Sequence, residues 1–294
     1  MPDLTVNGGK VRYELIGPEG GDTVVITPGG RFGMEYRGVR PFAEAFAAAG
    51  KRVLIWDRPN TGASDIQLYG RSESHMRAET LAGLVEQLGL GPIAVLGGSG
   101  GARDSIVFTI EYPHLVRRLV VWSIVGGAFS SISLASVYVL DEIRTLRRNG
   151  IDGILALKGR AGSWSDLVDA NPANEQRLRD LGAEEFERVM WQWFEAYVPK
   201  ATEAIPGVAD HEMRQIDVPT LIVRGGEGDI DHPKRTSMEV HSLIRSSRFV
   251  EPPWPEDAWE RGQALRDAGK GGIFDPWMDG VPTFLEFIDS EKGI

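Results

Sequence analysis

The stretch Gly97-Gly98-Ser99-Gly100-Gly101 follows the apolar run 93–96 and precedes a helix-like segment at 102–111. The pattern Gly-x-Ser-x-Gly between a strand and a helix is typical of a sharp turn that exposes a nucleophilic serine. Glycines on both sides of Ser99 allow backbone angles and close contacts that a side chain would prevent. The alternatives are an ordinary glycine-rich turn and a phosphate-binding loop, whose complete Gly-x-Gly-x-x-Gly pattern is missing here. We therefore take Ser99 as the candidate nucleophile.

Around this turn, short apolar segments alternate with helix-like segments. In chain order they are strand-like 23–26, helix-like 41–49, strand-like 52–56, helix-like 76–88, strand-like 93–96 and, beyond the serine turn, strand-like 119–122. Buried strands that alternate with helices at this spacing favour a parallel sheet with both faces covered. The sequence therefore predicts an α/β fold with a mostly parallel, twisted sheet and helices on both faces.

The alternation stops after residue 129 and returns at strand-like 220–223. Residues 130–211 show helical patterns without a strand signal, so we expect a core of 1–129 and 212–294 that is interrupted by a helical insertion. Ligands of open α/β sheets bind at the carboxyl ends of the strands. The insertion is therefore expected to form a cap over that edge, and the alternative is a helical domain elsewhere on the surface.

Composition excludes several classes of protein. The 294-residue chain has a net charge of −10 and scattered Lys and Arg, which argues against a nucleic-acid partner. No apolar run approaches the ~20 residues that span a bilayer, and the first residues do not resemble a secretion signal, so we expect no membrane association and a cytoplasmic location. Without cysteine, disulfides, thiolate catalysis and cysteine-bound zinc are excluded. The sequence indicates no cofactor and no metal site, and it leaves the oligomeric state open.

Five segments give the chain a resemblance to the α/β-hydrolase superfamily over nearly its whole length. They are residues 28–30, 56–64, 97–101, 112–116 and 226–233. The Gly-Gly-Ser start of the serine turn is similar to that of prolyl iminopeptidases and meta-cleavage hydrolases. The resemblance implies the α/β-hydrolase fold and a serine nucleophile.

A serine hydroxyl needs a base within ~3 Å, and the tetrahedral intermediate needs two hydrogen-bond donors for its oxyanion. The resemblance implies that these donors are the backbone N–H groups of Gly100, directly after Ser99, and of Gly30. The pair Gly29-Gly30 leaves an accessible backbone at this point, although glycine pairs also form plain β-turns.

The acid of the expected triad follows the strand-like run 220–223. Asp229 lies three residues after Gly226, which matches the acid position of the superfamily. Asp231 and Glu227 are nearby alternatives that could equally be solvated carboxylates of a turn.

The base is where the chain departs from the superfamily. That pattern orders serine, acid and then histidine, with the histidine after the last strand. The corresponding segment, 251–257, contains no histidine, and the five histidines of the chain are at 75, 114, 211, 232 and 241. Loss of a triad histidine costs about 10⁶ in kcat in the best-studied case, so the gap needs an explanation.

Three hypotheses address this gap. His232, three residues after Asp229, could act as the base, although one tight loop would then have to align both side chains. Glu256 or Asp257 could replace the histidine, although a carboxylate is a weak base unless it is buried. Alternatively, the triad is incomplete, and the protein is a lyase, a cyclase, a cofactor-free oxygenase or a ligand-binding member. A related possibility is that another histidine, such as His211, acts as the base.

The substrate is expected to be a small apolar or aromatic compound that contains an ester, a lactone or an activated C–C bond. Arg31 follows the proposed oxyanion glycine and could bind an anionic group, as could Arg103. For Arg58 and Arg103, however, an ion pair with a neighbouring aspartate such as Asp104 is the simpler expectation. Trp122 ends a strand and is expected to form an apolar wall of the pocket.

Overall fold

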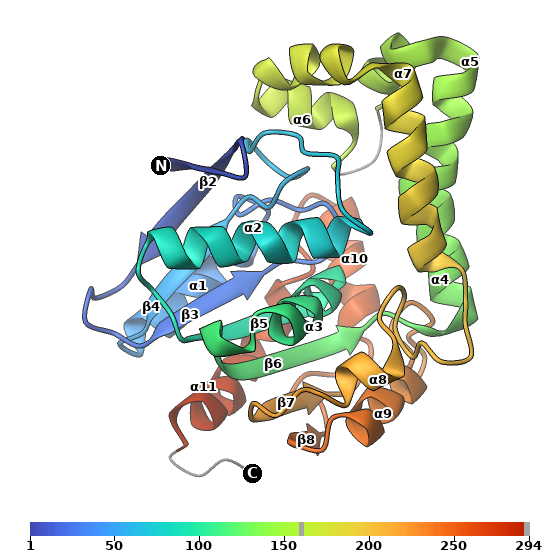
Figure 1. The fold of residues 1–294 in the computed structure, drawn as a ribbon. Helices are drawn as coiled ribbons and strands as arrows, with labels where there is room; N and C mark the ends of the chain where they lie inside the picture. The colour runs from blue at the N-terminus through green and yellow to red at the C-terminus, as the bar shows by residue number, and fades with distance from the viewer. Residues whose placement is uncertain (159–161, 291–294) are drawn as a thin grey trace.

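The computed structural model describes residues 1–158 and 162–290, and an eight-stranded sheet forms its centre (Figure 1). The strands are β1 (Asp3–Val6), β2 (Gly9–Ile16), β3 (Thr23–Thr27), β4 (Arg52–Trp56), β5 (Ile93–Ser99), β6 (Val116–Ile124), β7 (Thr220–Val223) and β8 (Ser247–Val250). Their order is β1-β2-β4-β3-β5-β6-β7-β8. β2 pairs antiparallel with β1 and β4, whereas the pairings from β4 onward are parallel. The predicted α/β class is confirmed.

Helices cover both faces of the sheet, as predicted. One face packs against α2 (Glu73–Gln87), α3 (Gly100–Glu111) and α9 (Lys234–Leu243). The other face packs against α1 (Val39–Ala48) and α11 (Val281–Asp289). The remaining helical elements outside the insertion are η1 (Pro113–Leu115), α8 (Asp210–Met213), α10 (Ala258–Asp267) and η4 (Asp275–Gly280).

The pleat of each central strand divides its side chains between these two layers. In β5, Ile93 and Val95 face the α2 and α3 layer, whereas Ala94 and Leu96 face the α1 and α11 layer. All four side chains are fully buried, which explains the continuous apolar run. Burial of a large aliphatic side chain contributes about 1.5–3 kcal/mol, so this strand anchors the serine turn that follows it.

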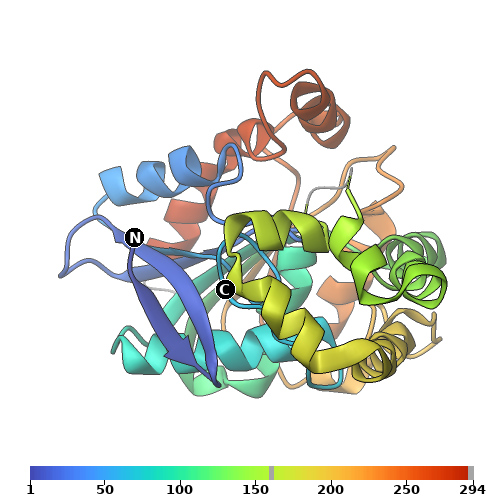
Figure 2. The ribbon, with the colours of Figure 1, turned by 90° about the horizontal axis from the view of Figure 1, so that it is seen from above.

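A helical insertion separates β6 from β7. Its elements are α4 (Gly127–Ala135), the π-helix η2 (Ser136–Leu140), α5 (Asp141–Ala156), α6 (Trp164–Ala170), α7 (Ala173–Phe194) and η3 (Glu195–Tyr197). Figures 1 and 2 show α5 and α7 side by side, beyond the carboxyl ends of β5 and β6. The insertion has its own apolar core, which includes Trp164, Phe186 and Trp193. It begins at Gly127, three residues before the expected boundary, and its status as a separate domain stays a prediction.

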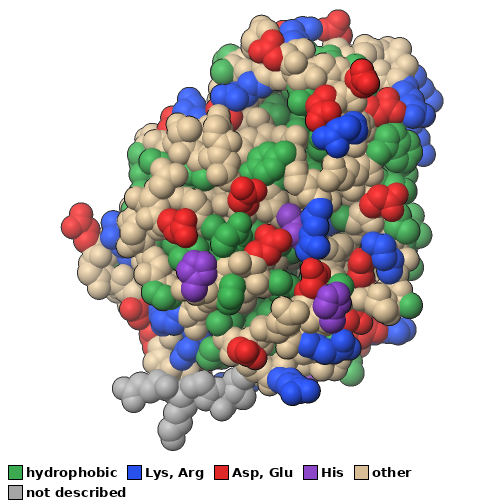
Figure 3. Space-filling model, in the orientation of Figure 1, with side chains coloured by type: hydrophobic (Ala, Val, Ile, Leu, Met, Phe, Trp, Pro, Cys, Tyr) green, Lys and Arg blue, Asp and Glu red, His purple; other side chains and the backbone are tan. Residues whose placement is uncertain are grey.

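The surface carries charged side chains of both signs (Figure 3). Acidic and basic side chains are interspersed over the face in Figure 3, and the chain as a whole has a net charge of −10. Across residues 1–158 and 162–290, none of the helices combines the length and the apolar character that a bilayer crossing requires.

Candidate active site

Ser99 lies at the sharp turn between β5 and α3. Its backbone has φ 57° and ψ −127°, a conformation that costs energy for a residue with a side chain and is typical of functional sites. The neighbouring backbone is packed too tightly for other residues. A Cβ on Gly101 would lie 2.0 Å from the Thr27 carbonyl oxygen, and a Cβ on Gly29 would lie 2.8 Å from the Ser99 Cβ. The glycines at these positions therefore allow the turn to form.

A chain of hydrogen bonds joins Ser99 to two buried side chains. The Ser99 Oγ lies 2.8 Å from His232 Nε2, and His232 Nδ1 lies 2.9 Å from Asp229 Oδ2. His232 is 1% exposed and Asp229 is 4% exposed. With Asp229 ionised, Nδ1 carries the proton and donates it, which leaves Nε2 as the acceptor for the serine O–H. We assign this tautomer from the hydrogen-bond network.

The loop that holds Asp229 and His232 also orients them. The second carboxylate oxygen of Asp229 accepts hydrogen bonds from the backbone N–H groups of Asp231, at 3.0 Å, and His232, at 2.9 Å. The carboxylate is therefore fixed by its own turn and presents its other oxygen to the imidazole. This answers the geometric objection that one tight loop might not align both side chains with the serine.

Two residues outside this loop support it. The indole of Trp259, on α10, packs edge-to-face against the His232 ring at 4.4 Å, and its Nε1 donates to the Asp231 carboxylate at 3.1 Å. The Ser130 hydroxyl, on α4, donates to the Asp231 carbonyl oxygen at 2.7 Å. Neither residue has a sequence signal, because both contacts depend on how α4 and α10 pack in the folded chain.

Glu227, a candidate acid, and Glu256 and Asp257, the candidate replacements for the base, have other partners. Glu227 forms an ion pair with Lys234. Glu256 is half-exposed and forms an ion pair with Arg224, whose hydrogen bond lowers the pKa of the Glu256 carboxyl to about 2. A carboxylate with so low a pKa is a poor base. Asp257, the other proposed substitute, lies 3.9 Å from an arginine on α10.

The other histidines also lie in different surroundings. Burial lowers the pKa of His75 to about 3. His241 lies 2.7 Å from the Ser247 hydroxyl, whereas His114 and His211 are exposed. Of the residues proposed as bases, the structure brings His232 to the serine.

A cavity of about 50 Å³ opens beside Ser99. Gly30 and Gly100, the two predicted oxyanion donors, both line it, and the Gly30 nitrogen lies 3.1 Å from the position of a Cβ on Gly100. The rest of the wall is partly apolar and partly charged. It consists of Arg31, Glu73, Arg77, Arg103, Val125, Leu134, Tyr138 and Tyr197. Of its charged residues, Arg31 and Arg103 were considered as substrate-binding residues from the sequence, whereas Glu73 and Arg77 were not.

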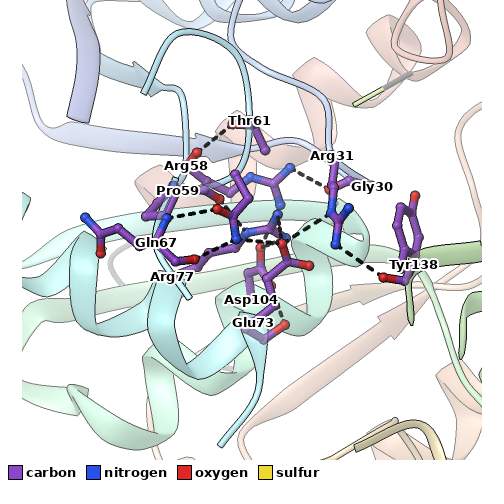
Figure 4. A network of polar contacts seen from close by, with 12 residues as sticks. Gly30, Arg31, Arg58, Pro59, Thr61, Gln67, Glu73, Arg77, Asp104 and Tyr138 are labelled. Atoms are coloured by element: carbon purple, nitrogen blue, oxygen red, sulfur yellow. Dashed lines mark hydrogen bonds and ion pairs between the residues drawn. The ribbon is translucent and has the colours of Figure 1, made fainter. Parts of the chain in front are cut away.

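Arg31 lies on the cavity wall, but its guanidinium already has partners. It forms an ion pair with Glu73 at 3.3 Å (Figure 4). It also forms one with Glu142 at 3.6 Å and lies 4.6 Å over the Trp164 ring. The charge of Arg31 is therefore compensated within the protein, and its predicted role in binding an anionic group stays a prediction.

The expectation for Trp122 requires correction. Its ring is fully buried and packs against Trp277 at 5.4 Å, Phe284 at 5.2 Å and Phe42 at 5.9 Å. These residues belong to the layer between the sheet and the helices α1 and α11. Trp122 is thus a core residue of this layer and does not form a wall of the cavity beside Ser99.

Comparison with known proteins relates this architecture to hydrolases. The family model described as "alpha/beta hydrolase fold" matches residues 22–256. A curated relative, the 2-hydroxy-6-oxononadienedioate/2-hydroxy-6-oxononatrienedioate hydrolase of Escherichia coli (strain K12), is 32% identical over 173 residues. The match covers 55% of this chain and 57% of the relative, so the chain spans little more than half the length of the curated relatives that it matches.

Solved structures share the fold over nearly the whole chain. The enol-lactonase from Burkholderia xenovorans LB400 has a TM-score of 0.59 and 17% identity, with 98% of this chain and 100% of that chain covered. The esterase RhEst1 from Rhodococcus sp. ECU1013 has a TM-score of 0.60 and 18% identity, with 99% and 98% covered. A mutant of the meta-cleavage product hydrolase CumD has a TM-score of 0.58 and 16% identity, with 98% and 97% covered.

Proposed function

Because the chain belongs to the α/β-hydrolase family, we propose that it is a serine hydrolase with Ser99 as nucleophile, His232 as general base and Asp229 as the orienting acid. The observation that carries the proposal is the hydrogen-bond chain from Ser99 through His232 to Asp229, with steps of 2.8 and 2.9 Å. A base in hydrogen-bond contact with the serine supports hydrolysis over the alternative of a lyase, cyclase, oxygenase or binding protein with an incomplete triad.

The first half of the reaction forms an acyl-enzyme. Ser99 Oγ attacks the carbonyl carbon of the substrate while its proton moves to His232 Nε2. The charge that develops on the carbonyl oxygen is stabilised by the backbone N–H groups of Gly30 and Gly100, the latter at the positive end of α3. The imidazolium then gives its proton to the leaving group, and the bond between the carbonyl carbon and the leaving group breaks.

The second half regenerates the serine. His232 takes a proton from a water molecule, whose oxygen attacks the acyl carbon through a second oxyanion. The collapse of this intermediate returns the proton to Ser99 Oγ and releases the acid. Asp229 stays ionised throughout and stabilises the imidazolium that forms in each half.

The scissile bond is proposed to be an ester, a lactone or an activated C–C bond of a small compound. The names of the relatives support this range, because they describe a C–C hydrolase, an enol-lactonase and an esterase. Val125, Leu134, Tyr138 and Tyr197 provide an apolar and aromatic wall for part of the substrate. Leu134, Tyr138 and Tyr197 belong to the helical insertion, which we propose acts as a cap of residues 130–211, and Val125 directly follows β6.

Substitution of the nucleophile tests the proposal. The wild-type protein is expected to react with a fluorophosphonate probe and to hydrolyse p-nitrophenyl acetate. Ser99→Ala should abolish labelling and lower kcat by about 10⁵–10⁶. The control Ser242→Ala, on the exposed side of α9, should behave as wild type. Labelling or turnover that survives Ser99→Ala would contradict the proposal.

A further inference from the structure

A buried arginine in the cavity wall forms no direct ion pair with a carboxylate of residues 1–158 and 162–290. Arg103, in the first turn of α3, is 7% exposed and lines the same cavity as Ser99. Its Nε donates to the Ser74 hydroxyl at 2.8 Å, and its Nη2 donates to the Tyr197 hydroxyl at 3.0 Å. Its Nη1 is buried and has no hydrogen-bond partner among the described residues. The guanidinium thus contacts neutral hydroxyls, where an ion pair with Asp104 was expected from the sequence.

The neighbouring carboxylates are bound to other arginines. Asp104 forms an ion pair with Arg58 at 2.6 Å, and Glu73 forms one with Arg77 at 3.0 Å (Figure 4). Despite its burial, Glu73 has a pKa lowered to about 2 by the arginines around it, so it is ionised at neutral pH. Despite burial, the charges of Asp104 and Glu73 raise the pKa of Arg103, but its guanidinium donates its hydrogen bonds to Ser74 and Tyr197 and to neither carboxylate.

The buried cluster as a whole has an excess of positive charge. It contains four arginines (31, 58, 77 and 103) and three carboxylates (73, 104 and 142), which gives 4 − 3 = +1. A buried N–H group without an acceptor, such as Arg103 Nη1, is costly, because it has lost its hydration and gained no hydrogen bond. An anion in the cavity would remove this cost and would occupy the free donor of Arg103.

We propose that Arg103 binds a carboxylate of the substrate, so that the enzyme acts on an acid that also contains the scissile carbonyl group. This inference rests on the proposed function, because it assigns the substrate class of the Ser99 site. Arg103 and Ser99 line one small cavity, which requires the carboxylate and the scissile carbonyl to be separated by a few bonds. The planar guanidinium, fixed by Ser74 and Tyr197, suits a carboxylate better than a flexible ammonium would.

A matched pair of esters tests the proposal in the wild-type enzyme. p-Nitrophenyl hydrogen glutarate and p-nitrophenyl pentanoate share the leaving group and differ at the far end of the acyl chain, where one carries a carboxylate. The expected ratio of their kcat/KM values is about ten- to a hundredfold in favour of the glutarate, the range of a hydrogen bond to a charged group. Spontaneous hydrolysis is subtracted in each case.

Variants assign this preference to Arg103. Arg103→Met should bring the ratio close to one, and Arg103→Lys should retain part of it, which keeps the test decisive if the methionine variant does not fold. The control Arg188→Met removes an exposed arginine from α7 and should keep the wild-type ratio. A wild-type ratio near or below one, or an unchanged ratio in both Arg103 variants, would overturn the inference while the hydrolase function stands.

A binding experiment separates the two proposals if neither ester is hydrolysed. Calorimetric titration of the Ser99→Ala variant with monomethyl glutarate and dimethyl glutarate compares one anion with its neutral counterpart without turnover. Tighter binding of the monomethyl ester, lost in the Ser99→Ala/Arg103→Met double variant, would support the anion site even if Ser99 is not the nucleophile. Equal binding of the two esters, or no binding of either, would overturn it.

Discussion

The loop after β7 (residues 224–233) supplies both Asp229 and His232 to the hydrogen-bond chain on Ser99, whereas the loop after β8 (residues 251–257) supplies neither. In the superfamily pattern, the histidine would come from the second loop. Here that loop has a supporting role. Glu256 is bound to Arg224, and the following helix provides the ring of Trp259 that packs against His232.

The geometry of the sheet explains why either of the two loops can supply the histidine that contacts Ser99. β7 and β8 are parallel neighbours, so the loops that follow them leave the sheet at the same edge. Neighbouring strands are about 4.7–4.9 Å apart, a distance that a histidine side chain can bridge. The position of an imidazole relative to the serine therefore determines its chemistry, and the order of residues along the chain does not.

The strongest test of this comparison is the removal of the imidazole. His232→Ala is expected to lower kcat by about 10⁵–10⁶ and to abolish fluorophosphonate labelling, because Ser99 would lose its proton acceptor. The control is His114→Ala, which removes an exposed histidine and should leave both readouts unchanged. A His232→Ala variant that labels at the wild-type rate would mean that the base comes from another part of the chain.

The sequence predicts the central fold well because the strands are buried on both faces. The apolar run 93–96 and the glycine-rich turn after it correspond to β5 and the start of α3. The helix α10 was not predicted, for a physical reason. Of its residues, only Ala258 and Gly262 are buried, so the helix has no apolar stripe that could show in the sequence.

The site is less predictable, because its contacts depend on register and packing. Asp229 was proposed from its match to the acid position of the superfamily, and His232 from its position three residues later. The structure brings them together, although their roles stay predictions. Trp122 was predicted to form a wall of the pocket, but it lies in the core between the sheet and the helices α1 and α11. The alternation along β6 puts it on the same face as Val120, and that alternation is a signal that could have identified it as a core residue. No comparable signal exists for Trp259.

A smaller effect is expected when Trp259, on the helix that follows the β8 loop, no longer packs against His232. Trp259→Leu removes the ring beside His232 and the hydrogen bond to Asp231, so the imidazole should be less well aligned. We expect kcat to fall about tenfold with little change in KM, because misalignment affects the reacting groups more than substrate binding. The control Trp191→Leu, on the exposed side of α7, should leave kcat unchanged. An unchanged kcat in Trp259→Leu would limit the role of this ring to packing.

The smallest effect is expected for Glu256, the carboxylate that occupies the β8 loop. Glu256→Gln should keep kcat/KM within about twofold of wild type, because a half-exposed ion pair with Arg224 contributes to the fold and not to proton transfer. The pKa of Glu256 in the folded protein, about 2, lies below its ordinary value of 4.5. Its contribution to stability is therefore present above pH 4.5 and is lost as the pH falls toward 2.

Melting temperatures measured against pH check the second half of this prediction. At pH 7, Glu256→Gln should melt slightly below wild type, by less than about 3 °C, and the difference should shrink below pH 4.5. Glu260→Gln, an exposed change on α10, serves as the control for the loss of one negative charge. If Glu256→Gln instead lowered kcat as far as His232→Ala does, the base would lie in the loop after β8, and the two loops would have the opposite roles.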